Sequence, residues 1–270
     1  MKHSDPTKTF FSSVDMLHFP DAFSVPRPTN SAVLVTGAAK RLGRAIAISL
    51  ARSGWKVGIH FNESQDAAEE VKRDIQKFGG CAEIFRADLS DTADVNSLIL
   101  RAERLMGTIG VLINNASVFE WDDTPSATEE TFATHMNMHL KSPLTLSQKL
   151  VGQLPKKAGG LIINIIDSRV LNPKPRHLTY TLSKSGLWTL TQVMAEELAP
   201  RVRVNAIGPG PILPLDGQSE AQFRERCGRL PLQRPASLVE VCDAVKFLIS
   251  QRAITGQMIA LDGGDHFIGQ

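Results

Sequence analysis

The sequence predicts an α/β fold in which a parallel sheet is covered by helices on both faces. Short apolar runs rich in β-branched residues, such as 161–166, are typical of strands buried on both sides. They alternate with longer segments such as 180–198, whose apolar residues recur with the helical period. Strands and helices that alternate in this way form parallel sheets, and ligands bind at the carboxyl edge of such sheets.

Length and composition fit one α/β domain with a small-molecule partner. The chain has 270 residues, of which 42% are hydrophobic and 21% charged, values that are ordinary for a globular protein. A net charge of +2 favours neither nucleic acid nor a membrane as a partner. The three cysteines lack C-x-x-C spacing and the seven histidines lack ligand spacing. We therefore expect no metal, and reduced thiols in a cytoplasmic protein.

Residues 1–30 differ from the rest of the chain. They contain four prolines among scattered polar residues, which predicts a flexible N-terminal tail. The basic start, apolar run and cleavage site of a secretory signal are missing. We expect a single domain at 31–270.

The elements of that domain follow from the same patterns. In the first half we expect strands at 32–36, 56–61, 81–86 and 110–114, and helices at 44–51, 66–78 and 95–106. In the second half we expect strands at 161–166, 201–207 and 257–261, and helices at 129–150, 180–198 and 238–250. The stretch 213–232 is polar and shows no regular period, which predicts an irregular segment.

A glycine-containing turn follows the first strand and opens the first helix. Gly37 permits a tight turn, and Gly43 allows the helix to pack close to the strand. The free N–H groups at the helix start can bind a pyrophosphate. The spacing is T-G-x5-G, not G-x-G-x-x-G, so an ordinary connection between strand and helix is the alternative.

The end of the second strand favours NADPH over NADH. An NAD site usually carries a carboxylate at this position, but here the strand ends in Phe61. Asn62 and Ser64 can donate hydrogen bonds to a 2′-phosphate, and Arg41 can reach it as a cation. Glu63 opposes this interpretation because its charge would repel the phosphate.

Polar and small residues follow the third and fourth strands as well. Asp88 can accept a hydrogen bond from an adenine amino group, or it can cap the next helix, a role that Ser90 or Asp91 could fill instead. Asn115 and Ala116 suit the close approach of a cofactor.

The candidate catalytic group is Asp167, Tyr180 and Lys184. Asp167 ends a buried strand, while Tyr180 and Lys184 are four residues apart and share one face of a helix. An ammonium beside a phenol lowers the pKa of the phenol and makes it a plausible general acid. By itself Y-x-x-x-K is common on helix surfaces, and Asp167 could merely cap the following segment.

Several motifs in register together resemble the short-chain dehydrogenase/reductases. They are Thr36-Gly37 to Gly43, Asn114-Asn115-Ala116, Asn137, Tyr180-x-x-x-Lys184, Pro209-Gly210 and Leu261-Asp-Gly-Gly264. The resemblance covers about 31–266 and implies a Rossmann-like three-layer sandwich with a seven-stranded parallel sheet, usually in a homotetramer. It makes Tyr180 the proton donor, Lys184 its partner and the ribose anchor, and Asn137 a relay residue. It also implies cofactor contacts at Leu42, Leu89, Pro209 and Gly210.

Two departures from the usual family pattern point to one branch. Most members carry serine where this chain has Asp167, and glycine where it has Arg41. Together with Ser117 and Phe119 these residues look like the pteridine reductases and dihydromonapterin or dihydrofolate reductases. That resemblance implies that Arg41, Ser117 and Phe119 contact a pterin, with Phe119 stacked on its ring. A carboxyl beside a phenol suits proton delivery to a C=N nitrogen.

We therefore expect an NADPH-dependent reductase of a pterin-type C=N bond, with a substrate lid near 211–232. Arg224, Arg226 and Arg229 in this stretch could meet an acidic substrate, but a solvated helix face is the simpler interpretation. One alternative is a carbonyl reductase that acts on a 3-oxoacyl group or another ketone. The other is a non-catalytic sensor that binds NADP, which would not need Tyr180 and Lys184.

Overall fold

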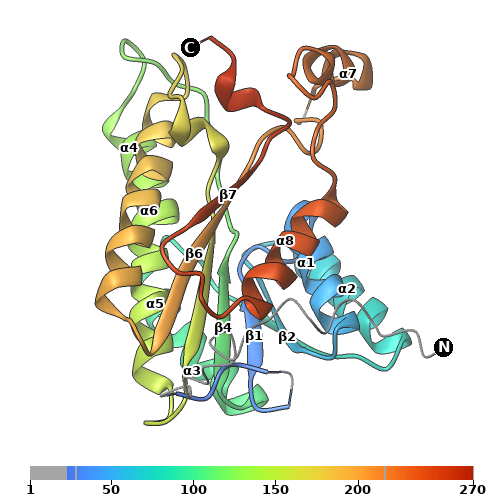
Figure 1. Cartoon of the computed structure of the whole chain (residues 1–270), viewed down its shortest axis with the longest axis vertical. Helices are drawn as coiled ribbons and strands as arrows, with labels where there is room; N and C mark the ends of the chain where they lie inside the picture. Colours follow the sequence, from blue (N-terminus) through green and yellow to red (C-terminus); the bar gives the residue numbers. More distant parts are fainter. Residues whose placement is uncertain (1–22, 28, 216, 270) are drawn as a thin grey trace, which may run out of the picture.

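The computed structural model describes residues 23–27, 29–215 and 217–269, and in these a seven-stranded parallel sheet forms the centre of the molecule (Figure 1). The strand order is β3-β2-β1-β4-β5-β6-β7. The strands are β1 (Ala32–Val35), β2 (Lys56–Phe61), β3 (Cys81–Arg86), β4 (Ile109–Asn114), β5 (Gly160–Ile165), β6 (Val202–Pro209) and β7 (Met258–Leu261). The predicted Rossmann-like α/β fold is confirmed.

Helices cover both faces of this sheet because alternate strand residues point to opposite sides. In β1, Val33 and Val35 belong to one apolar core, and Ala32 and Leu34 to the other. The first core is closed by α1 (Arg41–Arg52), α2 (Gln65–Lys77) and α8 (Leu238–Ser250), and the second by α3 (Thr92–Met106), α5 (Ser142–Gln153) and α6 (Leu178–Glu197). Figure 1 shows these two helical layers on either side of the strands.

The order of the strands defines where a ligand would bind. β1 pairs with β2 on one side and with β4 on the other. The connection after β1 and the connection after β4 therefore lead in opposite directions along the sheet. The carboxyl ends of strands at such a switch point leave room for a ligand between diverging connections. The loops after β1, β4 and β5 meet at this edge, and they carry most of the predicted site.

Two segments differ from the sequence-based prediction. The stretch 213–232, predicted as irregular, contains α7 (Glu220–Gly228), which begins at a reciprocal cap between Ser219 and Gln222. Its apolar period is absent because it buries little besides Cys227. The predicted helix 129–150 is α4 (Glu129–Met136) followed by α5, with a π-helical turn, η3 (Asn137–Lys141), between them. Pro143 has no N–H for the carbonyl four residues earlier, which accounts for the wider turn before it.

Ser24, within the predicted tail, contacts the segment that precedes β5. Ser24 donates a hydrogen bond to the carbonyl of Lys157 (2.8 Å) and accepts one from Gly159 N–H (2.7 Å). Residues 1–22 of the predicted tail lie outside the described residues. No helix in the described part of the chain is long and apolar enough to cross a membrane.

Candidate active site

The structure brings Asp167, Tyr180 and Lys184 together at the carboxyl end of β5. The Tyr180 hydroxyl donates a hydrogen bond to Oδ2 of Asp167 at 2.9 Å. Lys184 Nζ donates to the carbonyl of Ile165 at 3.0 Å and lies 5.7 Å from the centre of the Tyr180 ring. Oδ1 of Asp167 accepts from Arg169 N–H (2.8 Å). Asp167 therefore caps the following turn with one oxygen and faces the phenol with the other.

Burial sets the electrostatics of this group. It raises the pKa of Asp167 and lowers the pKa of Lys184 to about 8, because each charged form loses hydration. Burial and the Asp167 charge together raise the pKa of Tyr180 well above its ordinary value. The expected lowering of the phenol pKa by Lys184 is wrong for this state, since the carboxylate is hydrogen-bonded to the hydroxyl while the ammonium faces a carbonyl. Burial therefore favours the protonated forms of both Tyr180 and Asp167.

The segment after β4 places Phe119 against Tyr180. Their ring centres are 4.7 Å apart with an interplanar angle of 89°, and Phe119 also stacks on His177 at 4.2 Å. Phe119 remains 43% exposed, so part of the ring is open to a planar ligand. Ser117 Oγ lies 2.9 Å from Nε2 of His139.

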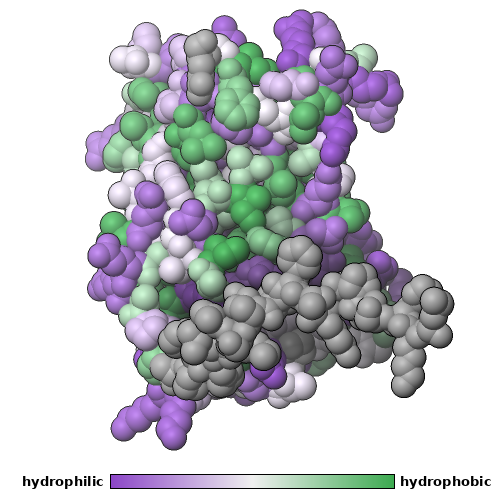
Figure 2. Space-filling model, in the orientation of Figure 1, coloured by the Kyte–Doolittle hydropathy of each residue, from purple (hydrophilic) through white to green (hydrophobic). Residues whose placement is uncertain are grey.

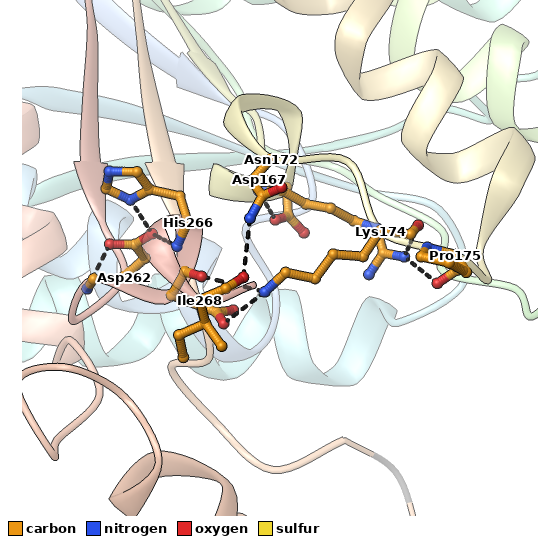
Figure 3. Close-up of polar contacts among 10 residues, drawn as sticks. Asp167, Asn172, Lys174, Pro175, Asp262, His266 and Ile268 are labelled. Carbon is orange, nitrogen blue, oxygen red and sulfur yellow. Dashed lines mark hydrogen bonds and ion pairs between the residues drawn. The ribbon is translucent and has the colours of Figure 1, made fainter. Parts of the chain in front are cut away.

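The loop between Asp167 and Tyr180 is held by cationic side chains. Arg169 donates to the carbonyls of Lys174, Pro175 and Arg176 (2.6, 2.8 and 2.6 Å). Figure 3 shows that the C-terminal segment clamps the same loop: Asn172 donates to the carbonyl of Ile268 (3.0 Å), and Lys174 contacts Asp265. The C-terminal segment is itself fixed by a contact between Asp262 and His266 (2.6 Å).

The glycine turn after β1 has no room for side chains. Gly37 has a positive φ of 60°, and a Cβ there would lie 2.9 Å from Ala116 Cα. A Cβ at Gly43 would lie 2.2 Å from the carbonyl oxygen of Gly37. Asn115 donates to the carbonyls of Thr36 and Gly37 (2.8 and 3.2 Å). The side chain of Asn115 therefore holds this turn by hydrogen bonds to the turn's backbone carbonyls.

Arg41 and Gly210 connect the turn to the predicted lid. Arg41 has a positive φ of 49° and donates to the carbonyl of Pro214 at 2.9 Å, with Leu42 following it in α1. After Pro209, the N–H of Gly210 donates to the carbonyl of Leu261 (3.0 Å), and a Cβ at Gly210 would meet Asp262 at 2.6 Å.

Asn62, Ser64 and Asp88 lie at the ends of neighbouring strands, since Phe61 of β2 pairs with Arg86 of β3. Oδ1 of Asp88 accepts from Ser90 N–H and Oγ (2.8 and 2.7 Å). Asp91, not Asp88, caps α3. Leu89 is buried.

Asn137, the predicted relay residue, lies in the π-helical turn η3. Within the described residues its side-chain amide makes no hydrogen bond, whereas His139, two positions later and on the other side of the helix, faces Tyr180 with ring centres 5.4 Å apart. The sequence-based interpretation also missed His60, which accepts a hydrogen bond from Gly37 N–H at 3.0 Å. In the sequence, the one signal for His139 was its spacing of four residues from His135.

The family follows from this arrangement and from one comparison. A family model described as short chain dehydrogenase matches residues 31–222. The chain belongs to the short-chain dehydrogenase/reductase family. It is therefore an oxidoreductase, and the expected family is confirmed.

Known proteins resemble the chain over most of its length. The 3-oxoacyl-[acyl-carrier-protein] reductase FabG of Staphylococcus aureus is 32% identical over 236 residues, covering 86% of this chain and 96% of that protein. Among solved structures, FolM alternative dihydrofolate reductase 1 from Brucella canis, complexed with NADP, is 43% identical with a TM-score of 0.86. That match covers 89% of this chain and 96% of the Brucella chain.

Proposed function

We propose that this enzyme is an NADPH-dependent reductase of a pterin-type C=N bond, of the dihydrobiopterin, dihydromonapterin or dihydrofolate class. The hydrogen bond of 2.9 Å from Tyr180 to Asp167 carries the proposal. Reduction of C=N adds hydride to carbon and a proton to nitrogen. A buried carboxyl with a raised pKa can hold and deliver that proton, whereas a serine in its place could only hydrogen-bond a carbonyl oxygen.

The residues present fit a bound NADPH, which supplies the hydride. Gly37 and Gly43 leave space where side chains would block close approach, and Lys184 can anchor the ribose. Asn62 and Ser64 follow a strand that ends in Phe61 and not in a carboxylate. These features support NADP(H) over NAD(H), as does the NADP in the similar Brucella structure.

The proton would pass through this chain's own residues in a short sequence. The ring nitrogen of the substrate takes its proton from the Tyr180–Asp167 pair, in which a hydrogen bond joins the phenol to the carboxyl. Lys184, whose pKa is about 8, balances negative charge that remains on the pair. Phe119 and Ser117 contact the pterin, and Arg41 reaches it from the opposite loop.

Activity with two substrate classes tests the proposal. NADPH oxidation is followed at equal concentrations of dihydrobiopterin, dihydrofolate and a 3-oxoacyl thioester. We expect turnover of the pterins, and a loss of about a hundredfold or more in Asp167→Ser. The matched control is Asp243→Ser on the exposed surface of α8, paired only with Lys246. The contradicting result is turnover of the thioester alone, as the resemblance to the Staphylococcus reductase would favour.

Assembly as a homotetramer is also proposed, on two exposed apolar surfaces. The first lies on α4, α5 and α6, with Phe132, Leu144, Leu182 and Val193 between 37% and 54% exposed. The second joins the edge strand β7 to Val239 and Phe247 of α8, which are 67% and 46% exposed. Figure 2 shows hydrophobic residues along the middle of the face where β7 lies in Figure 1. Two such surfaces give a closed tetramer. Light scattering should show a tetramer, and a monomer would contradict the proposed assembly.

A further inference from the structure

Two buried histidines join the segment that carries Phe119 to the helix that carries Tyr180. His135 and His139 are four residues apart and almost fully buried. Nε2 of His139 accepts from Val118 N–H at 3.2 Å, and Nε2 of His135 accepts from Glu120 N–H at 3.3 Å. The two rings therefore bind alternate N–H groups of one extended segment, on either side of Phe119.

The opposite nitrogens of the same rings bind α6. Nδ1 of His135 lies 2.7 Å from Thr179 Oγ1, and Nδ1 of His139 lies 2.8 Å from Ser183 Oγ. Thr179 and Ser183 are also four residues apart, so the two histidines and the two hydroxyls form parallel rungs. Tyr180 lies between these rungs, with its ring centre 5.9 Å from that of His135 and 5.4 Å from that of His139.

The hydrogen-bond donors fix a single tautomer for both rings. A backbone N–H can only donate, so each Nε2 must be the unprotonated acceptor. Each Nδ1 then carries the proton and donates to its hydroxyl. The hydroxyl hydrogens go onward, from Thr179 to the buried carboxylate of Asp122 and from Ser183 to the carbonyl of Tyr180. Both histidines are thus neutral, and every donor in these two series of hydrogen bonds has an acceptor.

We propose that His135 and His139 are positioning residues that hold the Val118–Glu120 backbone and thereby set the place of Phe119 opposite Tyr180. Neither ring has to touch the substrate. In the case of His139, Ser117 Oγ shares the same Nε2 at 2.9 Å, so the orientation of that hydroxyl depends on the ring as well. The expected consequence for a pterin rests on the proposed function, whereas the effect on the segment does not.

Asparagine and glutamine separate the two sides of each ring. A glutamine amide reaches the position of Nε2 and can accept a hydrogen bond from an N–H of the segment. An asparagine amide reaches the position of Nδ1 and can bond only the hydroxyl on α6. His135→Gln and His135→Asn each lose one hydrogen bond, and so should lower the melting temperature by similar amounts, whereas His139→Asn loses the bonds to both Val118 N–H and Ser117 Oγ. Thr189→Ala is the control, because its hydroxyl bonds only the carbonyl of Ser185 on the exposed side of α6.

Hydrogen exchange of the NADP-loaded protein tests the segment directly. We expect exchange at Val118 and its neighbours to rise about tenfold in His139→Asn and much less in His139→Gln. The corresponding His135 pair should act in the same way at Glu120. Equal exchange in the Asn and Gln variants, or exchange unchanged from the wild type, would overturn the proposal.

Kinetics then connect the segment to the substrate. The KM for dihydropterin should rise about five- to tenfold in His139→Asn, with a smaller rise in His139→Gln and an unchanged Kd for NADPH. The His135 variants, which each lose one hydrogen bond, provide the check: a rise in KM that only follows the melting temperature in that pair indicates general destabilisation and counts against the proposal. If the wild type reduces no pterin but exchange separates the variants, the proposed function fails and the positioning role stands.

Discussion

Nδ1 of His60, in β2, accepts a hydrogen bond from the N–H of Gly37 at 3.0 Å. The other nitrogen, Nε2, lies 3.0 Å from the carbonyl of Ala87 and donates to it. One buried ring therefore ties the glycine turn after β1 to the ends of two neighbouring strands. The turn proposed to hold the pyrophosphate is shaped from beneath by a side chain that would not touch the cofactor.

Replacing His60 should weaken cofactor binding. His60→Phe leaves the N–H of Gly37 and the carbonyl of Ala87 without partners, which costs about 1 to 3 kcal/mol for each buried group. We expect the Kd for NADPH, measured by fluorescence titration, to rise by about tenfold or more. His60→Asn keeps an acceptor near Nδ1 and should bind more tightly than His60→Phe. Equal affinity in both variants would remove the role assigned to the ring.

Acid should destabilise the protein through its buried histidines. Burial lowers the pKa of His60 to about 4 and also lowers the pKa values of His135 and His139. The unfolded chain binds protons at these rings below about pH 6.5, while the folded protein does not. The free energy of unfolding therefore falls as the pH is lowered from 6.5 towards 4.

By this linkage, His60 alone should lower the free energy of unfolding at pH 5 by about 2 kcal/mol relative to neutral pH. Asp167 acts in the opposite direction, because its raised pKa makes the folded state bind a proton more readily than the unfolded one. Urea unfolding at pH 7, 6 and 5 measures the sum, and His60→Asn should reduce the slope. The same slope in His60→Asn and in the wild type would show that His60 is not neutral in the fold.

Tyr180→Phe separates proton delivery from binding. Loss of the hydroxyl removes the donor that partly stabilises the charged form of Asp167, so the pKa of Asp167 should rise further. We expect kcat to fall by about a hundredfold or more and the pH profile of the residual activity to move towards alkaline values. The Kd for NADPH should change little. Retained kcat would exclude Tyr180 from proton transfer.

Glu63 should weaken the preference for NADPH. It is exposed beside Asn62 and Ser64, where its charge would repel a 2′-phosphate across a short, partly screened distance. In Glu63→Gln we expect the KM for NADPH to fall by about two- to fivefold and the KM for NADH to stay the same. Glu69→Gln on α2, a half-buried glutamate, provides a comparison. Parallel changes for both cofactors would place the phosphate elsewhere.

The two glycines Gly43 and Gly152 should respond oppositely to alanine. A Cβ at Gly43 would lie 2.2 Å from the Gly37 oxygen and 2.6 Å from Asn115 Nδ2, so Gly43→Ala must displace the turn and lower the melting temperature strongly. At Gly152, inside α5, a Cβ would meet nothing within 4 Å, and alanine should add up to about 1 kcal/mol of stability. Thermal unfolding of both variants checks the contrast.

The order of strands and helices was predictable from sequence because burial imposes a period on each element. Runs such as 161–166 are apolar throughout because both faces of β5 are covered, and α8 shows its stripe because one side faces β6 and β7. The helix α7 was missed for the same reason, since it packs against little and its cap, Ser219, is its main signal. Arg224 and Arg229 pair with glutamates one turn away on the exposed face. This agrees with the simpler interpretation of these arginines, a solvated helix face.

By itself the sequence determined the family, the fold and the identity of Asp167, Tyr180 and Lys184 as a group, because local spacing and strand ends carry that information. Only the tertiary structure decided what these groups do to one another. Burial and a contact of 2.9 Å between residues thirteen apart raise the pKa of Tyr180, where spacing along one helix had suggested a lower value. It likewise placed the ring of His139 beside that of Tyr180, since the direction of a side chain depends on the helix packed against it.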